Sequence, residues 1–132
     1  MTKTFVWEFD RALAHEAPDI ELVELRGDAT PEVMDAFFAA AEKHGADTTV
    51  MYDIVWAESK WQNRQSDLHY TFTDPRRGIV EGDRERSYCY AQIHRPDHLH
   101  YTVEKLLDPE VCFDFLAREV ARGNTGIFYA YK

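Results

Sequence analysis

The hydrophobic and polar residues of this chain alternate with a period of two in seven separate stretches, as is typical of half-buried β-strands. The alternating stretches predict strands at residues 3–9, 20–27, 48–58, 68–73, 86–94, 98–105 and 125–132. Polar or turn-forming residues separate these stretches from one another. The pattern therefore predicts a protein built around a mainly antiparallel sheet.

Two segments instead show the spacing and the end signals of α-helices. Residues 30–45 begin with Thr30 as the N-cap, and residues 108–123 begin with Asp108 in the same role. Each N-cap is followed by a proline, and each segment ends at a glycine. The element order β-β-α-β-β-β-β-α-β predicts an α+β fold with two helices on one face of the sheet. At 132 residues, the chain has the size of a single domain.

The two helical segments resemble each other in sequence. When Pro31 is aligned with Pro109, the two segments share Pro, Glu, Val, Phe, Ala and Gly at matching positions. A predicted strand also stands before and after each of them. These matches indicate an internal duplication of β-α-β halves. Two unrelated helices with ordinary caps would share several of the same residues, so both interpretations stay open.

The composition predicts a soluble globular protein. Hydrophobic residues make up 45% of the chain and charged residues 30%, and no apolar run approaches the ~20 residues of a membrane span. The first ten residues lack the basic region and the apolar core of a signal peptide. We therefore expect a cytoplasmic protein. In that compartment we expect Cys89 and Cys112 to be reduced, buried residues rather than a disulfide.

The chain is acidic, with 24 Asp and Glu residues against 15 Lys and Arg residues and a net charge of −9. Lys and Arg neutralise nucleic-acid phosphates, so this negative charge disfavours nucleic acid as a partner. The lack of an apolar span likewise disfavours a membrane as a partner. An acidic surface serves solubility, or it attracts a basic protein. One candidate function is therefore an acidic interaction module, of the inhibitor or immunity type, for a basic partner.

One face of the predicted sheet collects aromatic rings, imidazoles and hydroxyls. In residues 68–73, 86–94 and 98–105, one strand parity carries mostly Tyr, His, Gln and Thr. Such side chains suit a small-molecule pocket, although a moderately polar, solvent-exposed face is the plain alternative. Our leading prediction is a non-catalytic protein that binds a small, partly aromatic ligand. The predicted ligand-binding residues are Tyr88, Tyr90, Gln92, His94, His69, His98, His100 and Trp56. Aromatic strand faces are also compatible with a homodimer.

The tripeptide His-Tyr-Thr occurs twice, at residues 69–71 and at residues 100–102. With their hydrophobic neighbours, the two copies resemble the signature of the 2H phosphoesterase superfamily, in which each half of a duplicated fold supplies one such motif on a strand. The resemblance implies that two facing imidazoles act as acid and base while two hydroxyls hold the phosphate. The catalytic residues would then be His69, Thr71, His100 and Thr102. The internal sequence match does not superimpose the two tripeptides, which weakens this second alternative.

Other motifs add little to these candidates. His98, His100 and Glu104 resemble the first metal motif of the cupins, but the flanking glycine and the second histidine motif are missing. We therefore predict no metal site. The sequence has no Gly-rich phosphate loop and no CxxC pair, and we predict no cofactor. The order of elements is similar to that of GyrI-like small-molecule-binding domains, which favours ligand binding at the level of fold alone.

Overall fold

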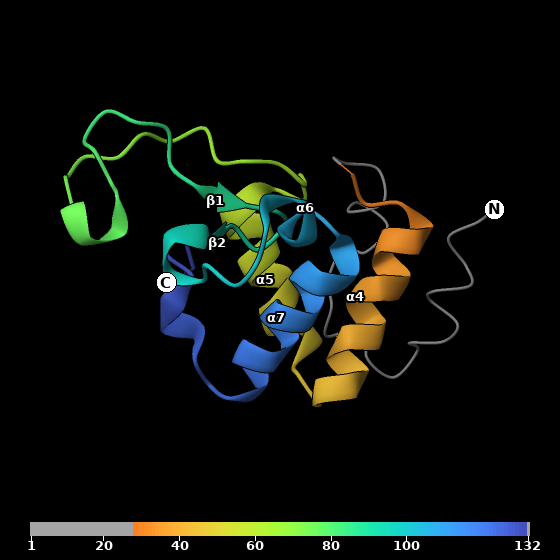
Figure 1. The fold of residues 1–132 in the computed structure, drawn as a ribbon. Helices are drawn as coiled ribbons and strands as arrows, with labels where there is room; N and C mark the ends of the chain where they lie inside the picture. The colour runs from red at the N-terminus through yellow and green to blue at the C-terminus, as the bar shows by residue number, and fades with distance from the viewer. Residues whose placement is uncertain (1–27, 132) are drawn as a thin grey trace.

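The computed structural model describes residues 28–131, so the predicted strands at 3–9 and 20–27 lie outside the described residues (Figure 1). Within this range the chain forms four α-helices and a small two-stranded antiparallel sheet, which is α+β in the broad sense. The predicted strand order and the internal duplication are not confirmed. No helix among the described residues is long and apolar enough to cross a membrane. The elements are α4 (Pro31–His44), α5 (Thr48–Ser59), η1 (Pro75–Arg77), β1 (Ser87–Tyr88), β2 (Ile93–His94), η2 (Arg95–Asp97), α6 (Val103–Leu106), α7 (Pro109–Ala121) and η3 (Thr125–Ile127).

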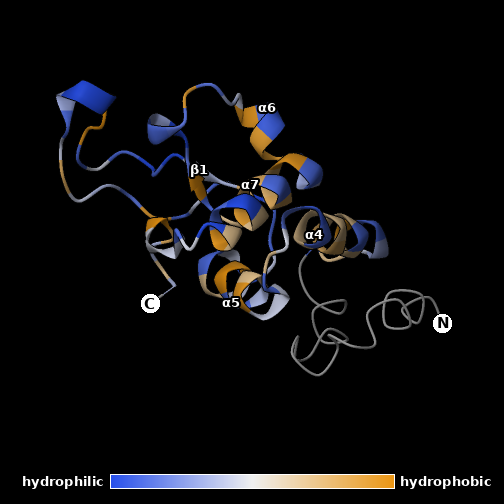
Figure 2. Ribbon diagram, turned by 90° about the horizontal axis from the view of Figure 1, so that it is seen from below, coloured by the Kyte–Doolittle hydropathy of each residue, from blue (hydrophilic) through white to orange (hydrophobic). Residues whose placement is uncertain are grey.

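Both predicted helices are confirmed as α4 and α7. The Val33 N–H group donates a hydrogen bond of 3.2 Å to Thr30 Oγ1 at the start of α4, and Asp108 caps α7 in the same way. Gly45 ends α4 with a φ of 67°, a left-handed conformation that costs glycine little. The two helices pack against each other through their apolar faces, which Figure 2 shows in orange and tan.

The predicted strand at 48–58 is wrong, because this segment is helix α5. Its β-branched and aromatic residues favour a strand. However, five of the six buried positions, 48, 51, 52, 55 and 59, follow the spacing of one helix face. Asp47 also accepts hydrogen bonds from the Thr49 and Val50 N–H groups at 2.9 and 3.3 Å. Capping and burial against the core therefore override the strand propensity of the individual residues.

The other predicted strands are shorter than expected or absent. The segment 86–94 contains β1 and β2, two residues each, joined by a turn at which Cys89 and Gln92 have φ values of 73° and 52°. The segment 68–73 has only isolated bridges, 98–105 contains a turn and the short helix α6, and 125–131 contains η3. The sheet is therefore too small to present the broad polar face that strand parity predicts.

Aromatic rings form the centre of the core. Trp61 is completely buried, and its ring centroid lies 5.3 Å from that of Phe37, 6.0 Å from that of Tyr90 and 6.1 Å from that of Phe113. The rings of Tyr90 and Phe113 stack at 5.0 Å. These side chains come from α4, the segment just after α5, the turn between β1 and β2, and α7, so the core joins all of these elements.

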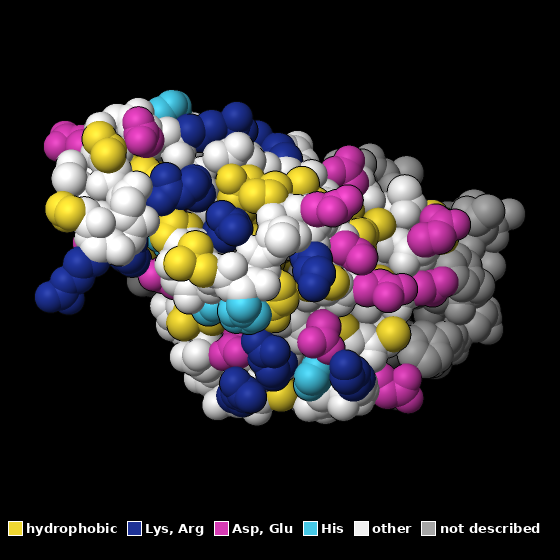
Figure 3. All heavy atoms as spheres, in the orientation of Figure 1, with side chains coloured by type: hydrophobic (Ala, Val, Ile, Leu, Met, Phe, Trp, Pro, Cys, Tyr) yellow, Lys and Arg dark blue, Asp and Glu magenta, His cyan; other side chains and the backbone are white. Residues whose placement is uncertain are grey.

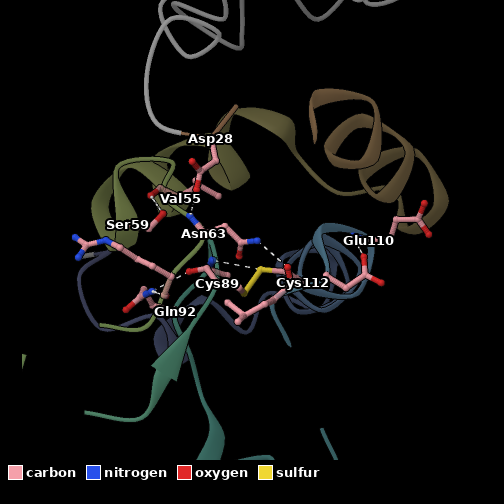
Figure 4. The surroundings of a disulfide bond; sticks show 12 residues. Asp28, Val55, Ser59, Asn63, Cys89, Gln92, Glu110 and Cys112 are labelled. Atoms are coloured by element: carbon pink, nitrogen blue, oxygen red, sulfur yellow. Dashed lines mark hydrogen bonds between the residues drawn. A yellow bond between two sulfur atoms is a disulfide. The ribbon is translucent and has the colours of Figure 1, made fainter. Parts of the chain in front are cut away.

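Cys89 and Cys112 form a disulfide, so the prediction that they are reduced is wrong, although the prediction that they are buried is confirmed (Figure 4). The bond joins the turn between β1 and β2 to α7 across a sequence separation of 23. Beside it, the Ala91 N–H group donates to Cys112 Sγ at 3.4 Å. The disulfide therefore fixes this turn on the helical core. The cytoplasmic location stays a prediction.

Residues 64–86, here called the arm, leave the helices after α5 and return at β1 (Figure 1). Bridges between His69 and Arg84 and between Asp74 and Ile79 hold its two sides together, and η1 forms its tip. Within the arm only Ser66, Tyr70 and Ile79 are buried. The arm is therefore a mostly polar extension beside the helical core.

Candidate functional site

A cleft of about 1010 Å³ lies between the arm and the rest of the molecule. Its walls come from the C-terminal end of α5, the arm, the residues of β1 and β2 with the turn between them (the hairpin), η2, α7 and the last residues of the chain. Its apolar lining includes Leu68, Tyr70, Phe72, Ile93, Phe115, Ile127, Phe128 and Tyr129. Figure 3 shows apolar side chains interleaved with Lys and Arg side chains near the arm. The cleft is thus the place where distant parts of the sequence meet.

The large apolar side chains that remain exposed concentrate at this cleft. In residues 28–131, seven such side chains are exposed: Leu68, Phe72, Val80, Leu99, Val103, Ile127 and Tyr129. Four of them, Leu68, Phe72, Ile127 and Tyr129, line the cleft. Scattered single apolar residues are normal on a protein surface, but a group around one concavity is typical of a binding site.

A chain of hydrogen bonds runs along one wall of the cleft. The Tyr70 hydroxyl lies 2.8 Å from His94 Nε2, and His94 Nδ1 lies 2.8 Å from an Asp97 carboxylate oxygen. Arg77 donates to the other carboxylate oxygen of Asp97 at 2.9 Å. The backbone N–H group of Arg86 donates to the Tyr70 hydroxyl at 3.0 Å. We call this series of hydrogen-bonded side chains the relay. All four of them line the cleft: Tyr70, Arg77, His94 and Asp97.

The relay has a defined protonation pattern. Partial burial tends to raise the pKa of Asp97, but the hydrogen bonds from His94 and Arg77 outweigh it and lower that pKa, which keeps the carboxylate ionised. An ionised carboxylate only accepts hydrogen bonds, so in the relay His94 Nδ1 carries a proton and donates it to Asp97. In the tautomer with only this proton, Nε2 accepts a hydrogen bond from the Tyr70 hydroxyl. The order of groups is the one that orients an imidazole as a base for a hydroxyl.

Glu58 is an ionisable group of the cleft outside the relay. One of its carboxylate oxygens accepts a hydrogen bond of 2.8 Å from the Ala130 N–H group, which ties α5 to the end of the chain. Burial raises the pKa of Glu58 to about 7, although the bond from Ala130 lowers it, and the negative charge of Glu85 raises it further. Glu58 therefore changes charge near neutral pH within the cleft.

Three of the predicted ligand-binding residues, Gln92, His94 and His98, line the cleft. The side chain of Gln92 donates to the carbonyl groups of Arg64 and Cys89, at 2.9 and 2.8 Å, and so closes the hairpin turn. The ring of His98 packs edge-on against Phe115 at 5.0 Å, and burial lowers the pKa of His98. His98 is therefore an apolar contact as well as a polar group.

The other predicted ligand-binding residues lie elsewhere. Tyr88 and Tyr90 are buried rather than on an open sheet face, and the Tyr90 hydroxyl donates to the Asp28 carbonyl at 3.1 Å. Burial raises the pKa of the Tyr90 hydroxyl far above its ordinary value. Trp56 packs against the core, with the Lys60 ammonium 5.0 Å from the centre of its ring. Tyr90 is therefore a core residue and not part of the cleft lining.

The residues of the phosphoesterase alternative are not gathered at the cleft. His69 and Thr71 are exposed on the arm, and His69 forms a backbone bridge with Arg84. His100 is exposed with its ring against that of Tyr101 at 4.2 Å, while the Thr102 hydroxyl accepts from the Lys105 N–H group as the N-cap of α6. Thr102 therefore has a structural role at a helix start. No contact among the described residues joins His69 to His100.

Sequence reasoning missed Tyr70, Asp97, Arg77 and Glu58. Asp97 follows His94 at a spacing of three residues, and Pro96 lies between them. This spacing suits a local His–carboxylate pair and could have been noticed. Tyr70 and Glu58 carry no such local signal, because their partners are distant in the sequence. Tyr70 contacts His94, and Glu58 contacts Ala130 near the end of the described residues.

No group of three or more His, Cys, Asp and Glu side chains in residues 28–131 is placed to hold a metal ion. Comparison with known proteins gives no match to a family model, to a curated protein or to a solved structure. The function must therefore be inferred from the cleft itself.

Proposed function

We propose that this protein binds a small, partly aromatic ligand in the cleft. The observation that carries the proposal is the cluster of exposed apolar side chains around a concavity of about 1010 Å³. This volume is at the upper end of the range of small-molecule sites, which are usually lined by apolar and aromatic side chains with a few polar groups. Here Glu58, His94 and His98 are among the polar groups. Compared with the sheet face predicted from sequence, the proposed site keeps Gln92, His94 and His98 and gains the arm and the chain end.

Two leucines offer a matched test. The side chains of Leu68 and Leu99 are almost equally exposed, at 66% and 67%, but only Leu68 lines the cleft. Burying a leucine against a ligand contributes roughly 1.5–3 kcal/mol, and about 1.4 kcal/mol corresponds to a tenfold change in affinity. The substitution Leu68→Asp should therefore weaken binding of a cleft ligand at least ~10-fold, whereas Leu99→Asp should leave it unchanged.

The neutral aromatic dye Nile red is a suitable first probe, since its fluorescence rises in apolar surroundings. Titration of the dye with wild-type protein and both leucine variants measures the two affinities directly. Equal affinities in the two variants, or no binding by the wild type, would contradict the proposed cleft. Thermal melts of the three proteins check that both substitutions leave the fold intact.

A second candidate function is the acidic interaction module for a basic protein. Acidic side chains gather on the side of α4 and α6 (Figure 3), and Glu32, Asp35, Glu42 and Glu104 are exposed there. Such a surface attracts basic partners at low ionic strength. A pull-down with the purified protein at low and high salt tests it, because charge-steered binding weakens with screening. The absence of any partner at low salt would contradict it. The homodimer stays a prediction.

A further inference from the structure

We propose that Tyr70 is a nucleophile of the cleft and accepts an acyl group from a small, partly aromatic ester. This inference rests on the proposed function, because the ester must enter the same cleft. It goes beyond ligand binding in assigning a reaction to the relay of Tyr70, His94, Asp97 and Arg77. The described residues place these groups in the order hydroxyl, imidazole, carboxylate and guanidinium.

The distances of the relay suit proton transfer. The Tyr70 hydroxyl lies 2.8 Å from His94 Nε2, and His94 Nδ1 lies 2.8 Å from Asp97. Both are hydrogen-bond distances of the kind that join a nucleophile to its base and the base to an orienting group. Arg77 holds Asp97 through its other oxygen at 2.9 Å, and it is itself bound to Asp74 at 2.8 Å. The carboxylate is thus fixed from two sides, and it fixes the ring of His94 in turn.

Arg86 contacts both the Tyr70 ring and its oxygen. The Arg86 N–H group donates to the hydroxyl oxygen at 3.0 Å, and the Arg86 guanidinium carbon lies 5.8 Å from the centre of the Tyr70 ring. His98, the residue that follows η2, also lines the cleft and interacts electrostatically with His94. Negative charge that develops on the Tyr70 oxygen is therefore met by one N–H donor and one nearby cation.

The reaction is a transfer of the acyl group to the phenol oxygen. The Tyr70 oxygen attacks the ester carbonyl carbon while its proton passes to His94 Nε2, and the imidazolium is stabilised by Asp97. The bond between the acyl carbon and the alcohol oxygen then breaks. The leaving alcohol or phenol takes the proton from His94, which leaves an O-acyl Tyr70 and a neutral imidazole. No oxidant, reductant or metal is needed for this step.

Access distinguishes Tyr70 from the other tyrosines. Tyr70 is 5% exposed and lines the cleft, whereas Tyr129 lines the same cleft but is 82% exposed. Exposure alone therefore predicts that Tyr129 reacts first. A faster reaction at the buried Tyr70 would instead show activation by its neighbours.

The experiment uses p-nitrophenyl acetate on the intact, unreduced protein at pH 7.5. Mass spectrometry of peptides follows the acetylation of Tyr70 and Tyr129 with time. General-base assistance is typically worth ~10²–10⁴-fold, so we expect Tyr70 to react at least ~10-fold faster than Tyr129 despite its burial. The variant His94→Gln should lower the Tyr70 rate about 100-fold, and Tyr70→Phe should remove the labelled peptide. Acetylation of Tyr70 no faster than Tyr129, or an unchanged rate in His94→Gln, would overturn the proposal.

Two further variants separate chemistry from loss of structure. His100→Gln changes an exposed histidine outside the cleft and should react like the wild type. Asp97→Asn tests Asp97 as a positioning residue, because it keeps the size of the side chain but removes the charge that stabilises the imidazolium. Its rate of Tyr70 acetylation should fall ~10-fold or more. The rate of Tyr70 acetylation in this variant should also rise steadily through pH 9, as the rate of an unassisted phenol does, and so differ from the wild-type pH profile. A wild-type profile in Asp97→Asn would contradict the relay.

The circular dichroism spectrum of each variant confirms that the variant is folded before its rate is compared. The outcomes also separate this inference from the proposed function. If Tyr70 is unreactive while Leu68→Asp still weakens dye binding and Leu99→Asp does not, the cleft binds ligands but the relay only holds the arm in place. If the dye test fails as well, both proposals fall.

Discussion

Removal of the disulfide is the perturbation whose size follows most directly from the structure. Cys89 and Cys112 close a loop with a sequence separation of 23. In the chain-entropy description, a cross-link across a loop of this length restricts the unfolded chain and stabilises the protein by about 3.4 kcal/mol at 25 °C. We therefore expect the double variant Cys89→Ser/Cys112→Ser to lose roughly 3 kcal/mol of unfolding free energy.

Serine is the matched substitution at both positions. Both cysteines are completely buried, and serine is close to cysteine in volume, so the core around them keeps its packing. At position 112 the serine hydroxyl is also able to accept the hydrogen bond that the Ala91 N–H group gives to sulfur. The double variant should therefore fold, with a near-ultraviolet circular dichroism spectrum close to that of the wild type.

Urea denaturation measures the difference. A small domain unfolds with a slope of about 1–3 kcal/mol per molar urea, so ~3 kcal/mol moves the midpoint by roughly 1–3 M. Wild-type protein unfolded in the presence of a reductant should share the lower midpoint of the double variant. Alkylation of the unreduced, denatured wild type should find no free thiol. If the oxidised wild type and the double variant unfold at the same urea concentration, the cross-link does not restrain the unfolded chain, and the reasoning is refuted.

Two further predictions concern α5. Because burial raises the pKa of Glu58 from its ordinary 4.5 to about 7, the folded state binds a proton between these pH values that the unfolded state releases, and the free energy of unfolding falls as the pH rises through that window. The full pKa difference corresponds to ~3.4 kcal/mol, but solvent screens the partly exposed carboxyl group. We therefore expect Glu58→Gln to be about 1–2 kcal/mol more stable than the wild type at pH 8 and equal to it at pH 4, as measured by urea denaturation at each pH. A constant difference in stability at all pH values would contradict the raised pKa of Glu58 as its cause. Asp47→Ala removes the N-cap of α5 and should cost ~1 kcal/mol, whereas Asp53→Ala, an exposed position on the same helix, should change stability by less than ~0.5 kcal/mol; equal losses would argue against capping.

The parts of the fold that sequence predicts well are those with local signals. Helices α4 and α7 each combine an N-cap, a proline and a terminal glycine with helical spacing, and all of these lie within one segment. The segment of α5 misleads because its valine, isoleucine, tyrosine and tryptophan favour strands. Its helical character depends on Asp47 and on burial against Trp61 and its neighbours, which only the folded chain supplies.

The candidate site is predicted in part for a similar reason. Strand parity needs a continuous strand, but the turn at Cys89 and Gln92 breaks the segment 86–94 in the middle. Tyr88 and Tyr90 therefore enter the core, while Gln92 and His94 reach the cleft. The disulfide is not predicted either, because the expected compartment is reducing. The proximity of Cys89 and Cys112, which allows the bond, follows only from the folded chain.

The fastening of the arm has a consequence for ligand recognition. Between residues 64 and 86 only three side chains are buried, and the arm is tied to η2 and β2 by Arg77 bound to Asp97 and Tyr70 bound to His94. A segment with so little apolar burial opens locally without unfolding the rest of the molecule. A molecule seated against Leu68 and Phe72 provides the apolar contacts that the arm lacks. If the proposed ligand binds there, its binding is coupled to the ordering of the arm, because the ligand would complete the hydrophobic contacts of the segment that encloses it.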